Sequence, residues 1–278
     1  MLRSMYSGIS GMKNFQTKLD VIGNNIANVN TFGYKKGRVT FKDMVSQTIS
    51  GATAPNPNVA GGINPKQVGL GSQISAIDTV DTQGSLQTTG RVLDVGIQGD
   101  GYFMVQKDGS TFYTRAGNFY LDNTGNLVTS NGEFVLGQNE QPIVIPGGEQ
   151  TPGGDPVPGV DQIESLSIGS DGKISWVIGG ELNDTPPVIG IARFANNGGL
   201  EKAGDNLYRE TTNSGIPIAK NPGAEGAGVL ISGALEMSNV DLSEEFTEMI
   251  TAQRGFQANT RIITTSDEIL QELVNLKR

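Results

Sequence analysis

The chain has 278 residues, a net charge of −9 and neither cysteine nor histidine. This length suffices for one large or two modest domains, but the two missing residue types exclude disulfides, thiolate nucleophiles, the usual zinc ligands and the commonest catalytic base. We therefore expect no enzyme, no metal site and no cofactor, and the acidic balance argues against a nucleic-acid partner.

Residues 1–30 predict an amphipathic helix. Its stripe follows alternating steps of three and four residues, with apolar side chains at Leu2, Met5, Ile9, Met12, Leu19 and Ile26 and with Gln16 and Gly23 at the two remaining steps. This spacing gives a narrow stripe like the seam of a coiled coil, which needs a partner. Gly8, Gly11 and Gly23 each weaken a helix by roughly 1 kcal/mol relative to alanine. We therefore expect this helix to form only when it is packed.

The N-terminal stretch is also basic. Residues 1–50 hold seven lysines and arginines against two aspartates. A solvated helix face explains this charge, and the alternative is attraction to acidic regions of neighbouring copies. No stretch approaches the ~20 apolar residues of a membrane span, and the start lacks the apolar region of a secretory signal. We expect no membrane insertion.

The middle of the chain changes character twice. Residues 31–73 are rich in Asn, Gly, Pro, Ser and Thr and predict an extended connector. Residues 74–239 alternate between short apolar stretches and turn signals, which predicts a β-rich outer domain built from hairpins. The pattern also admits a sub-domain near 138–220. The four clearest turns are at 107–110, 122–126, 130–133 and 170–173, and none has the ligand spacing of a calcium loop.

Residues 240–278 predict the strongest helix. The segment 239–245 offers cap residues and first-turn acids. A heptad stripe follows at Met249, Phe256, Ile263 and Leu270, and it is widened by Phe246, Ile250, Ile262, Ile269, Leu273, Val274 and Leu276. We expect Phe246 and the four heptad residues to form the interface. With residues 1–30 this helix would form one discontinuous assembly domain, in which the two stripes are the interface. Whether they pair within one chain, as in an ordinary helical layer, or between copies stays open.

Two long motifs at opposite ends carry a resemblance. Residues 23–35 (GNNIANVNTFGYK) and 235–259 (LEMSNVDLSEEFTEMITAQRGFQAN) resemble the terminal signatures of the flagellar rod and hook protein family. The positions that carry the first motif are Asn24, Asn25, Asn28, Asn30, Thr31 and Gly33. The resemblance implies a mainly β fold with terminal α-helices that form a coiled-coil inner layer. The asparagines would tolerate left-handed and turn conformations where the N-terminal helix ends, and Gly33 would make the exit turn.

The resemblance also implies a function and partners. Family members are structural subunits that pass unfolded through the type III export apparatus without a cleaved signal and assemble into helical homopolymers of the flagellum. Within the family, motif details favour the hook, a flexible universal joint, and the alternative is the distal rod, a stiff drive shaft. Partners would be further copies and the rod, hook-cap and hook–filament junction proteins. A secreted β-rich binding domain is the remote alternative.

Overall fold

The computed structural model describes residues 2–55, 61–145, 163–178, 181–182, 185–224 and 226–276. The chain divides into two compact units. The helical unit comprises residues 1–27, 37–79 and 241–278, and the β unit comprises residues 28–36 and 80–240. The chain is mainly β with an α-helix near each end, and the two helices pack together. The predicted fold class is therefore confirmed.

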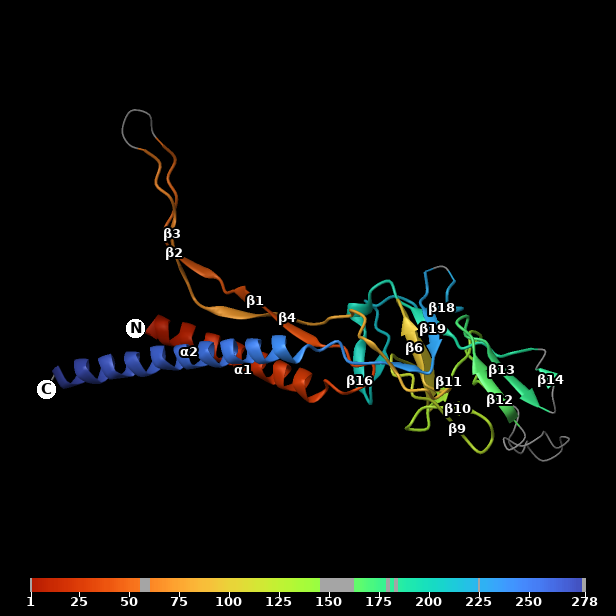
Figure 1. Ribbon diagram of the computed structural model, residues 1–278. Helices are drawn as coiled ribbons and strands as arrows, with labels where there is room; N and C mark the ends of the chain where they lie inside the picture. The colour runs from red at the N-terminus through yellow and green to blue at the C-terminus, as the bar shows by residue number, and fades with distance from the viewer. Residues whose placement is uncertain are drawn as a thin grey trace. The chain divides into compact units, whose positions relative to one another are not determined.

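Two antiparallel helices form the core of the helical unit. Helix α1 spans Leu2–Ala27 and helix α2 spans Leu242–Leu276. Gly8 faces Ile263 and Phe15 faces Gly255, so the two helices run in opposite directions. Both termini therefore lie at the same end of the helix pair (Figure 1). Helix α1 is continuous through its glycines. The prediction that it needs a partner is satisfied within one chain, which was one of the two alternatives left open.

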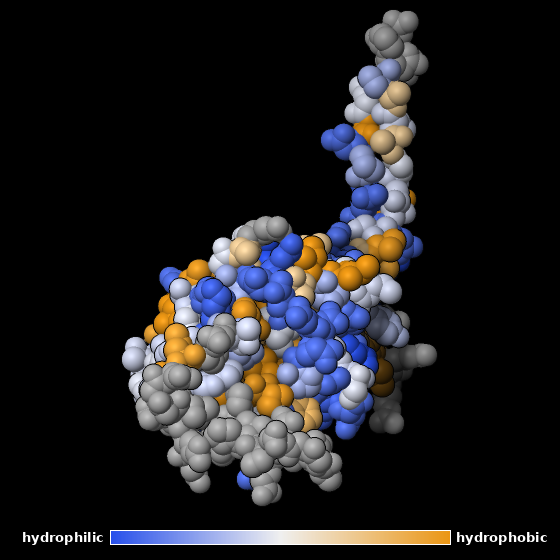
Figure 2. Space-filling model, turned by 90° about the vertical axis from the view of Figure 1, so that its right-hand side faces the viewer, coloured by the Kyte–Doolittle hydropathy of each residue, from blue (hydrophilic) through white to orange (hydrophobic). Residues whose placement is uncertain are grey.

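A long two-stranded ribbon completes the helical unit. Strand β1 (Gly37–Asp43) pairs with β4 (Ser72–Thr79), β2 (Ser46–Ser50) pairs with β3 (Lys66–Gly69), and both pairs are antiparallel. The structure differs here from the connector expected at 31–73. The polar and glycine-rich composition masked the strands, because a ribbon with no buried face lacks the alternating apolar pattern that marks most strands. Figure 2 shows hydrophobic residues exposed along the narrow ribbon.

The β unit contains the remaining strands of the described residues. Their bounds are β5 Leu86–Thr88, β6 Val95–Gln98, β7 Tyr102–Lys107, β8 Ser110–Thr114, β9 Tyr120–Leu121, β10 Leu127–Val128, β11 Phe134–Val135, β12 Ile163–Ile168, β13 Ile174–Ile178, β14 Glu181–Leu182, β15 Ile191–Arg193, β16 Glu201–Gly204, β17 Leu207–Arg209, β18 Ile218–Lys220, β19 Val229–Ser232 and β20 Ala234–Glu236, with a short 3-10 helix η2 at Asn197–Gly199.

The largest sheet runs in the order β16-β17-β8-β7-β11-β10-β9, and β15 joins β7 to β18. Smaller sheets are formed by β12-β13-β14, β19-β6 and β20-β5. The main core gathers buried aliphatic side chains around Phe103 and Phe119, whose rings meet edge to face at 5.0 Å. Burial of this apolar surface is the dominant stabilising contribution in the β unit.

All four turns singled out from the sequence connect paired strands. The turn at 107–110 joins β7 to β8, with Asp108 and Gly109 both at positive φ as a tight hairpin requires. The turns at 122–126 and 130–133 join β9 to β10 and β10 to β11, and the turn at 170–173 joins β12 to β13. These hairpin predictions are confirmed.

Among the residues that the structure describes, no helix is long and apolar enough to cross a membrane. The same residues contain no cluster of three or more acidic side chains placed to hold a metal ion.

Candidate assembly interface and its anchoring residues

Glycines are contact points between the two helices. A Cβ on Gly255 would lie 2.6 Å from the ring of Phe15, and a Cβ on Gly11 would lie 2.9 Å from the amide of Asn259. Both distances are shorter than van der Waals contact, so a Cβ at either position would force the side chain of Phe15 or Asn259 to shift. Gly8 lies at ordinary contact distance from Ile263. The sequence analysis treated the glycines only as residues that weaken α1 and did not predict these contacts. For Gly23, which has nothing within 4 Å, the weakening of the helix remains the only effect expected.

The predicted stripes lie beside the most buried line of each helix. On α1, Met5, Met12, Leu19 and Ile26 are half-buried and Ile9 is exposed, while the side chain of Leu2 lies outside the described residues. On α2, Met249, Phe256, Ile263 and Leu270 are half-buried and Phe246 is exposed. The structure thus brings part of both stripes toward the helix pair without burying them fully.

The fully buried line on α2 consists of small and polar residues that the sequence reasoning missed. Glu245, Ala252 and Ser266 are buried, and together with Asn259 they recur every seven residues. On α1 the same period relates Gly8, Phe15 and Ile22, of which Ile22 is 2% exposed. Close helix packing needs short side chains. A heptad repeat with short side chains on one helix, together with a glycine-containing heptad on the other, is the sequence pattern that could have predicted this contact line between α1 and α2.

A second face of α2 is left exposed toward its C-terminal end. Its apolar members in the described residues are Ile262, Ile269, Leu273 and Leu276, and Leu276 reaches 82% exposure. Leu242, Phe246, Ile250 and Val274 are exposed on other sides of the helix. Gly8 already lies opposite Ile263, so the six residues of α1 before Gly8 end well before α2 does. The last turns of α2 therefore carry unpaired apolar surface, which a soluble monomer rarely presents as a contiguous group.

Asn25 fastens the end of α1 inside the helical unit. Its Nδ2 donates to the carbonyl of Gly37 at 2.9 Å, and its Oδ1 accepts from the amide of Gly37, also at 2.9 Å. The same Nδ2 lies 3.1 Å from Oε2 of Glu245, in the first turn of α2. Asn25 is 1% exposed, so these bonds satisfy an otherwise costly buried amide. One side chain thus links α1, β1 and α2.

The start of α2 is capped by Asp241 instead of the earlier residues of the predicted cap segment. Oδ1 of Asp241 accepts from the amide of Ser243 at 2.8 Å and from that of Glu244 at 3.4 Å. An acidic side chain at this position satisfies amides of the first turn and complements the helix dipole.

The asparagine motif does not use left-handed backbone conformations. No motif asparagine has a positive φ, and Asn24 and Asn25 are helical. The left-handed part of this expectation is therefore wrong, whereas Asn28 and Asn30 lie in the turn that follows α1 and Asn25 bonds to the backbone of Gly37. Gly33 alone has φ of +68°, and a Cβ there would lie 2.6 Å from the amide nitrogen of Ala116. The exit turn predicted at Gly33 is confirmed.

A buried charge network holds the residues that follow Gly33. Nζ of Lys35 donates to Oε1 of Glu236 and to the carbonyl of Thr82, both at 2.8 Å. Oε2 of Glu236 accepts from Arg115 at 3.2 Å, and Lys35 is 1% exposed. Burial lowers the pKa of Lys35 from its ordinary value, and Glu236 acts against that shift. A buried ion pair with these extra hydrogen bonds is costly to break from one side.

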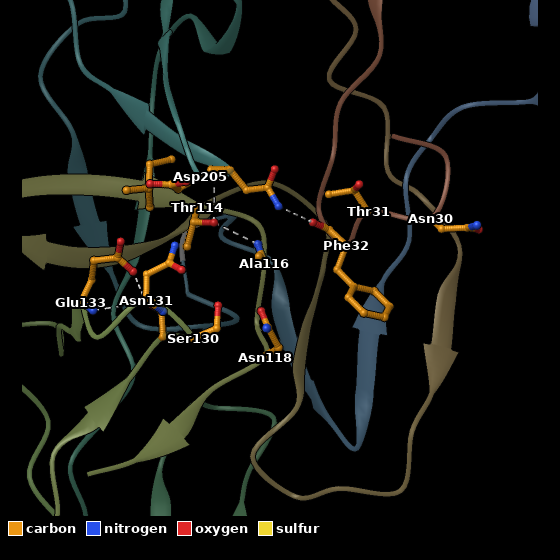
Figure 3. Close-up of a pocket in the computed structure, with 13 residues that line it drawn as sticks. Asn30, Thr31, Phe32, Thr114, Ala116, Asn118, Ser130, Asn131, Glu133 and Asp205 are labelled. Atoms are coloured by element: carbon orange, nitrogen blue, oxygen red, sulfur yellow. Dashed lines mark hydrogen bonds between the residues drawn. The ribbon is translucent and has the colours of Figure 1, made fainter. Parts of the chain in front are cut away.

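A polar pocket of about 180 Å³ adjoins the motif within the β unit. Figure 3 shows Thr31 and Phe32 on one side of it, with Asn118, Ser130 and Asn131 on the other. Nδ2 of Asn206 donates to the carbonyl of Phe32 at 3.4 Å across the wall. Amides and hydroxyls dominate this lining. Among the charged lining residues is Glu133, whose carboxylate accepts a hydrogen bond from the hydroxyl of Thr129.

Three protein families match successive parts of the chain. The family described as "Flagella basal body rod protein" matches residues 5–35, the "Flagellar hook protein FlgE/F/G D1 domain" matches residues 96–176, and "Flagellar basal body rod FlgEFG protein C-terminal" matches residues 231–276. The first match covers most of α1 and the whole of the anchored motif, and the last match covers α2.

Full-length relatives give the same result. The chain is 61% identical to the flagellar basal-body rod protein FlgG of Bacillus subtilis (strain 168), and the alignment covers 100% of both chains. It is 39% identical to FlgG of Borreliella burgdorferi and 33% identical to the flagellar hook protein FlgE of the same organism, again over the full length of each. The chain belongs to the flagellar rod and hook protein family.

Proposed function

We propose that this chain is a rod subunit of the bacterial flagellar basal body, which assembles into a stiff tubular shaft that transmits motor torque. The observation that carries the proposal is the full-length 61% identity to a basal-body rod protein. The relatives thus favour the distal rod, the alternative of the sequence analysis, over the hook that motif details favoured.

Alignment length supports this choice. The rod proteins of Bacillus and Borreliella align over 279 and 284 residues, close to the 278 residues of this chain. The Borreliella hook protein needs an alignment of 442 residues, so it carries a large insertion that this chain lacks.

Two exposed surfaces of the helical unit support polymerisation. The last turns of α2 leave Leu273, Val274 and Leu276 uncovered. The ribbon exposes Val45 and Ile49, and its strands β2 and β3 have no buried residue. A two-stranded ribbon is marginal in water by itself, and exposed apolar helix surface is usually covered by a partner. Further copies of the chain would cover both.

The proposed assembly interface consists of the two apolar stripes of the sequence analysis and the exposed face of α2. In this proposal the helical unit is the discontinuous assembly domain. Neighbouring copies would contact the exposed face at Ile269 and Leu273, while the Gly255–Phe15 contact stays within each copy. The chain would act in the flagellum, outside the cytoplasm, together with other rod and hook proteins.

Electron microscopy of basal bodies from a strain that lacks this chain tests the proposal. A truncated rod without a hook is the expected result. A complete rod that lacks only the hook would assign the chain to the hook instead.

Polymerisation is tested separately with Leu273→Asp, which places a charge on the exposed face of α2. This variant should fold as the wild-type chain does but fail to sediment as polymers. A matched control is Gln271→Asp, which adds the same charge at another exposed position of the same turn. Equal polymerisation of the Leu273 variant and the wild type would reject this surface as an interface.

A further inference from the structure

The chain enters or leaves the β unit at residues 28, 36, 80 and 240. Just inside these points lie three chain passages, which we define as residues 33–36, 80–84 and 236–239. Residues 28–36 both enter and leave the unit, so force that reaches the unit through the chain at residue 28, 36, 80 or 240 acts on a segment to which one of these passages belongs. How the passages are joined to one another therefore decides how the unit responds to such force.

Lys35 and Glu236 join all three passages. Lys35 donates to Glu236 of the third passage and to the carbonyl of Thr82 in the second. Glu236 also accepts from the amide of Gly84 at 2.9 Å, and its carbonyl accepts from the amide of Gly33 at 2.8 Å. The carboxylate is buried, so these are charge-assisted bonds shielded from water.

Asn239 repeats the arrangement with a neutral side chain. Its Oδ1 accepts from the amide of Lys36 at 2.8 Å, while its Nδ2 donates to the carbonyl of Val80 at 2.8 Å and to Oγ1 of Thr82 at 3.0 Å. A side-chain amide supplies an acceptor oxygen and two donor hydrogens at once. The amide of Val80 donates in turn to the carbonyl of Lys36 at 2.9 Å, which closes the ring of contacts.

We propose that Lys35, Glu236 and Asn239 form a force-transmitting clasp, which makes the three passages behave as one element, so that load on one is shared by the other two. Separate passages would instead pull out one at a time. The mechanical role rests on the proposed torque-transmitting function, but the coupling of the passages is a property of the single chain and can fail or hold independently of it.

The alternative is that these bonds only fill local hydrogen-bonding needs. The two readings differ in what happens far along the sequence. In the clasp, a change at residue 239 loosens residues 33–36 and 80–84, which lie more than 150 positions earlier. In the local reading, only residues next to 239 and its direct partners at 36, 80 and 82 respond.

Hydrogen exchange of the purified full-length chain separates the two readings. In Asn239→Asp the acceptor for the amide of Lys36 remains, but the donor is replaced by a carboxylate oxygen that faces the carbonyl oxygens of Val80 and Thr82. We expect amide exchange in all three passages to rise about tenfold or more, since opening exposes buried partners. Amides of β7 and β8 should keep their protection. An increase in exchange confined to residues next to 239 and to its hydrogen-bonded partners at 36, 80 and 82 would overturn the proposal.

A milder variant keeps the test decisive if Asn239→Asp unfolds the β unit. Thr82→Val keeps the side-chain shape and removes one hydrogen-bond partner of Asn239. It should raise exchange at 33–36 as well as at 80–84, and an unchanged first passage would contradict the clasp. The control is Glu201→Gln, which breaks the exposed pair with Arg209 in the same unit and should leave all three passages unchanged.

Swimming cells provide the functional readout. Cells that carry Thr82→Val should assemble normal flagella but stop rotating at a lower medium viscosity than cells that carry Glu201→Gln. If amide exchange rises in all three passages but the cells rotate normally under load, the passages are coupled and their mechanical role is overturned. Absence of flagella in both strains would instead point to the assembly step of the proposed function.

Discussion

Gly255 in α2 lies directly against the phenyl ring of Phe15 in α1. A Cβ added at residue 255 would lie within 2.6 Å of that ring, and the other ring atoms near it are within 2.9 Å. Phe15 also meets Phe41 of β1 at a ring distance of 6.1 Å, so the ring has a neighbour on another side as well. The glycine therefore fixes how closely the two helices approach.

Replacing this glycine should loosen the helix pair. We expect Gly255→Ala to lower the free energy of unfolding by about 1–3 kcal/mol, because the added methyl group forces the ring or the helices to move. Chemical denaturation followed by circular dichroism measures this change.

Gly23→Ala is the matched control, since residue 23 is helical and has nothing within 4 Å. It should stabilise the helix by ~0.5–1 kcal/mol through propensity alone. Stabilisation by both substitutions would show that Phe15 yields easily and that the contact does not set the helix spacing.

Gly33 should be the most sensitive glycine of the terminal motif. Gly33→Ala combines a left-handed backbone conformation with a Cβ that would lie 2.6 Å from the amide nitrogen of Ala116. Backbone atoms cannot move aside as a flexible side chain can, so we expect a loss of at least ~2 kcal/mol in the stability of the β unit.

Gly132→Ala separates the two causes, because Gly132 has φ of +86° but nothing within 4 Å. It should cost only the ~1–2 kcal/mol of an alanine held in the left-handed region. Thermal unfolding of both variants gives the comparison, and equal losses would mean that the close approach to residue 116 contributes nothing.

Asn25 should tolerate no charge. In Asn25→Asp, the donor to the carbonyl of Gly37 is lost, and a second carboxylate is placed near Glu245. We expect this isosteric change to destabilise the helical unit by about 2–4 kcal/mol at neutral pH. Part of the loss should be recovered at acidic pH, where either carboxylate can be protonated.

The neighbouring Asn24→Asp is the control, because residue 24 is exposed in the same last turn of α1 and carries the same unfavourable interaction with the helix dipole. Urea denaturation of the two variants at neutral pH isolates the effect of the buried bonds. Similar losses would indicate that the dipole, and not the Gly37 contact, makes the motif asparagine necessary.

The sequence predicted features that depend on local chemistry. Paired turn residues such as Asp108 and Gly109 specify hairpins by themselves, and the heptad of α2 specifies its helix. The ribbon was missed because its strands bury no residue and so leave no alternating pattern. A helix seam of glycine, alanine and serine was missed for a related reason, since apolar periodicity ignores residues whose value is their small size.

The two motifs contain the anchoring residues, but the sequence does not show which of them bond to one another. Glu236 and Lys35 are 201 positions apart, and only the folded chain brings them within 2.8 Å. Nothing in the composition marks one glutamate among many as buried. Asn239 begins the segment that was expected to cap α2, but tertiary bonds to residues 36 and 80 determine its position.

Three buried tyrosines should govern how the β unit responds to alkali. Burial raises the pKa of Tyr102, Tyr113 and Tyr208 above the ordinary value of 10.0. In the unfolded chain these groups release their protons near pH 10, whereas in the folded chain they keep them. The unfolded state therefore binds fewer protons above pH 10, and the free energy of unfolding falls as the pH rises through and beyond that value.

Denaturation in urea at several pH values between 8 and 12 measures this fall, and absorbance of the phenolate tracks the ionisation. Tyr102, Tyr113 and Tyr208 belong to a buried cluster that also contains Phe194. Tyr113→Phe removes one ionisable group from this cluster and keeps the ring, whose centroid lies 4.8 Å from that of Phe194. Its stability should decline less steeply above pH 10 than that of the wild-type chain. If every tyrosine instead ionises in one step near pH 10 while the chain stays folded, the three side chains are accessible to water and the packing around Phe194 is looser than this structure has it.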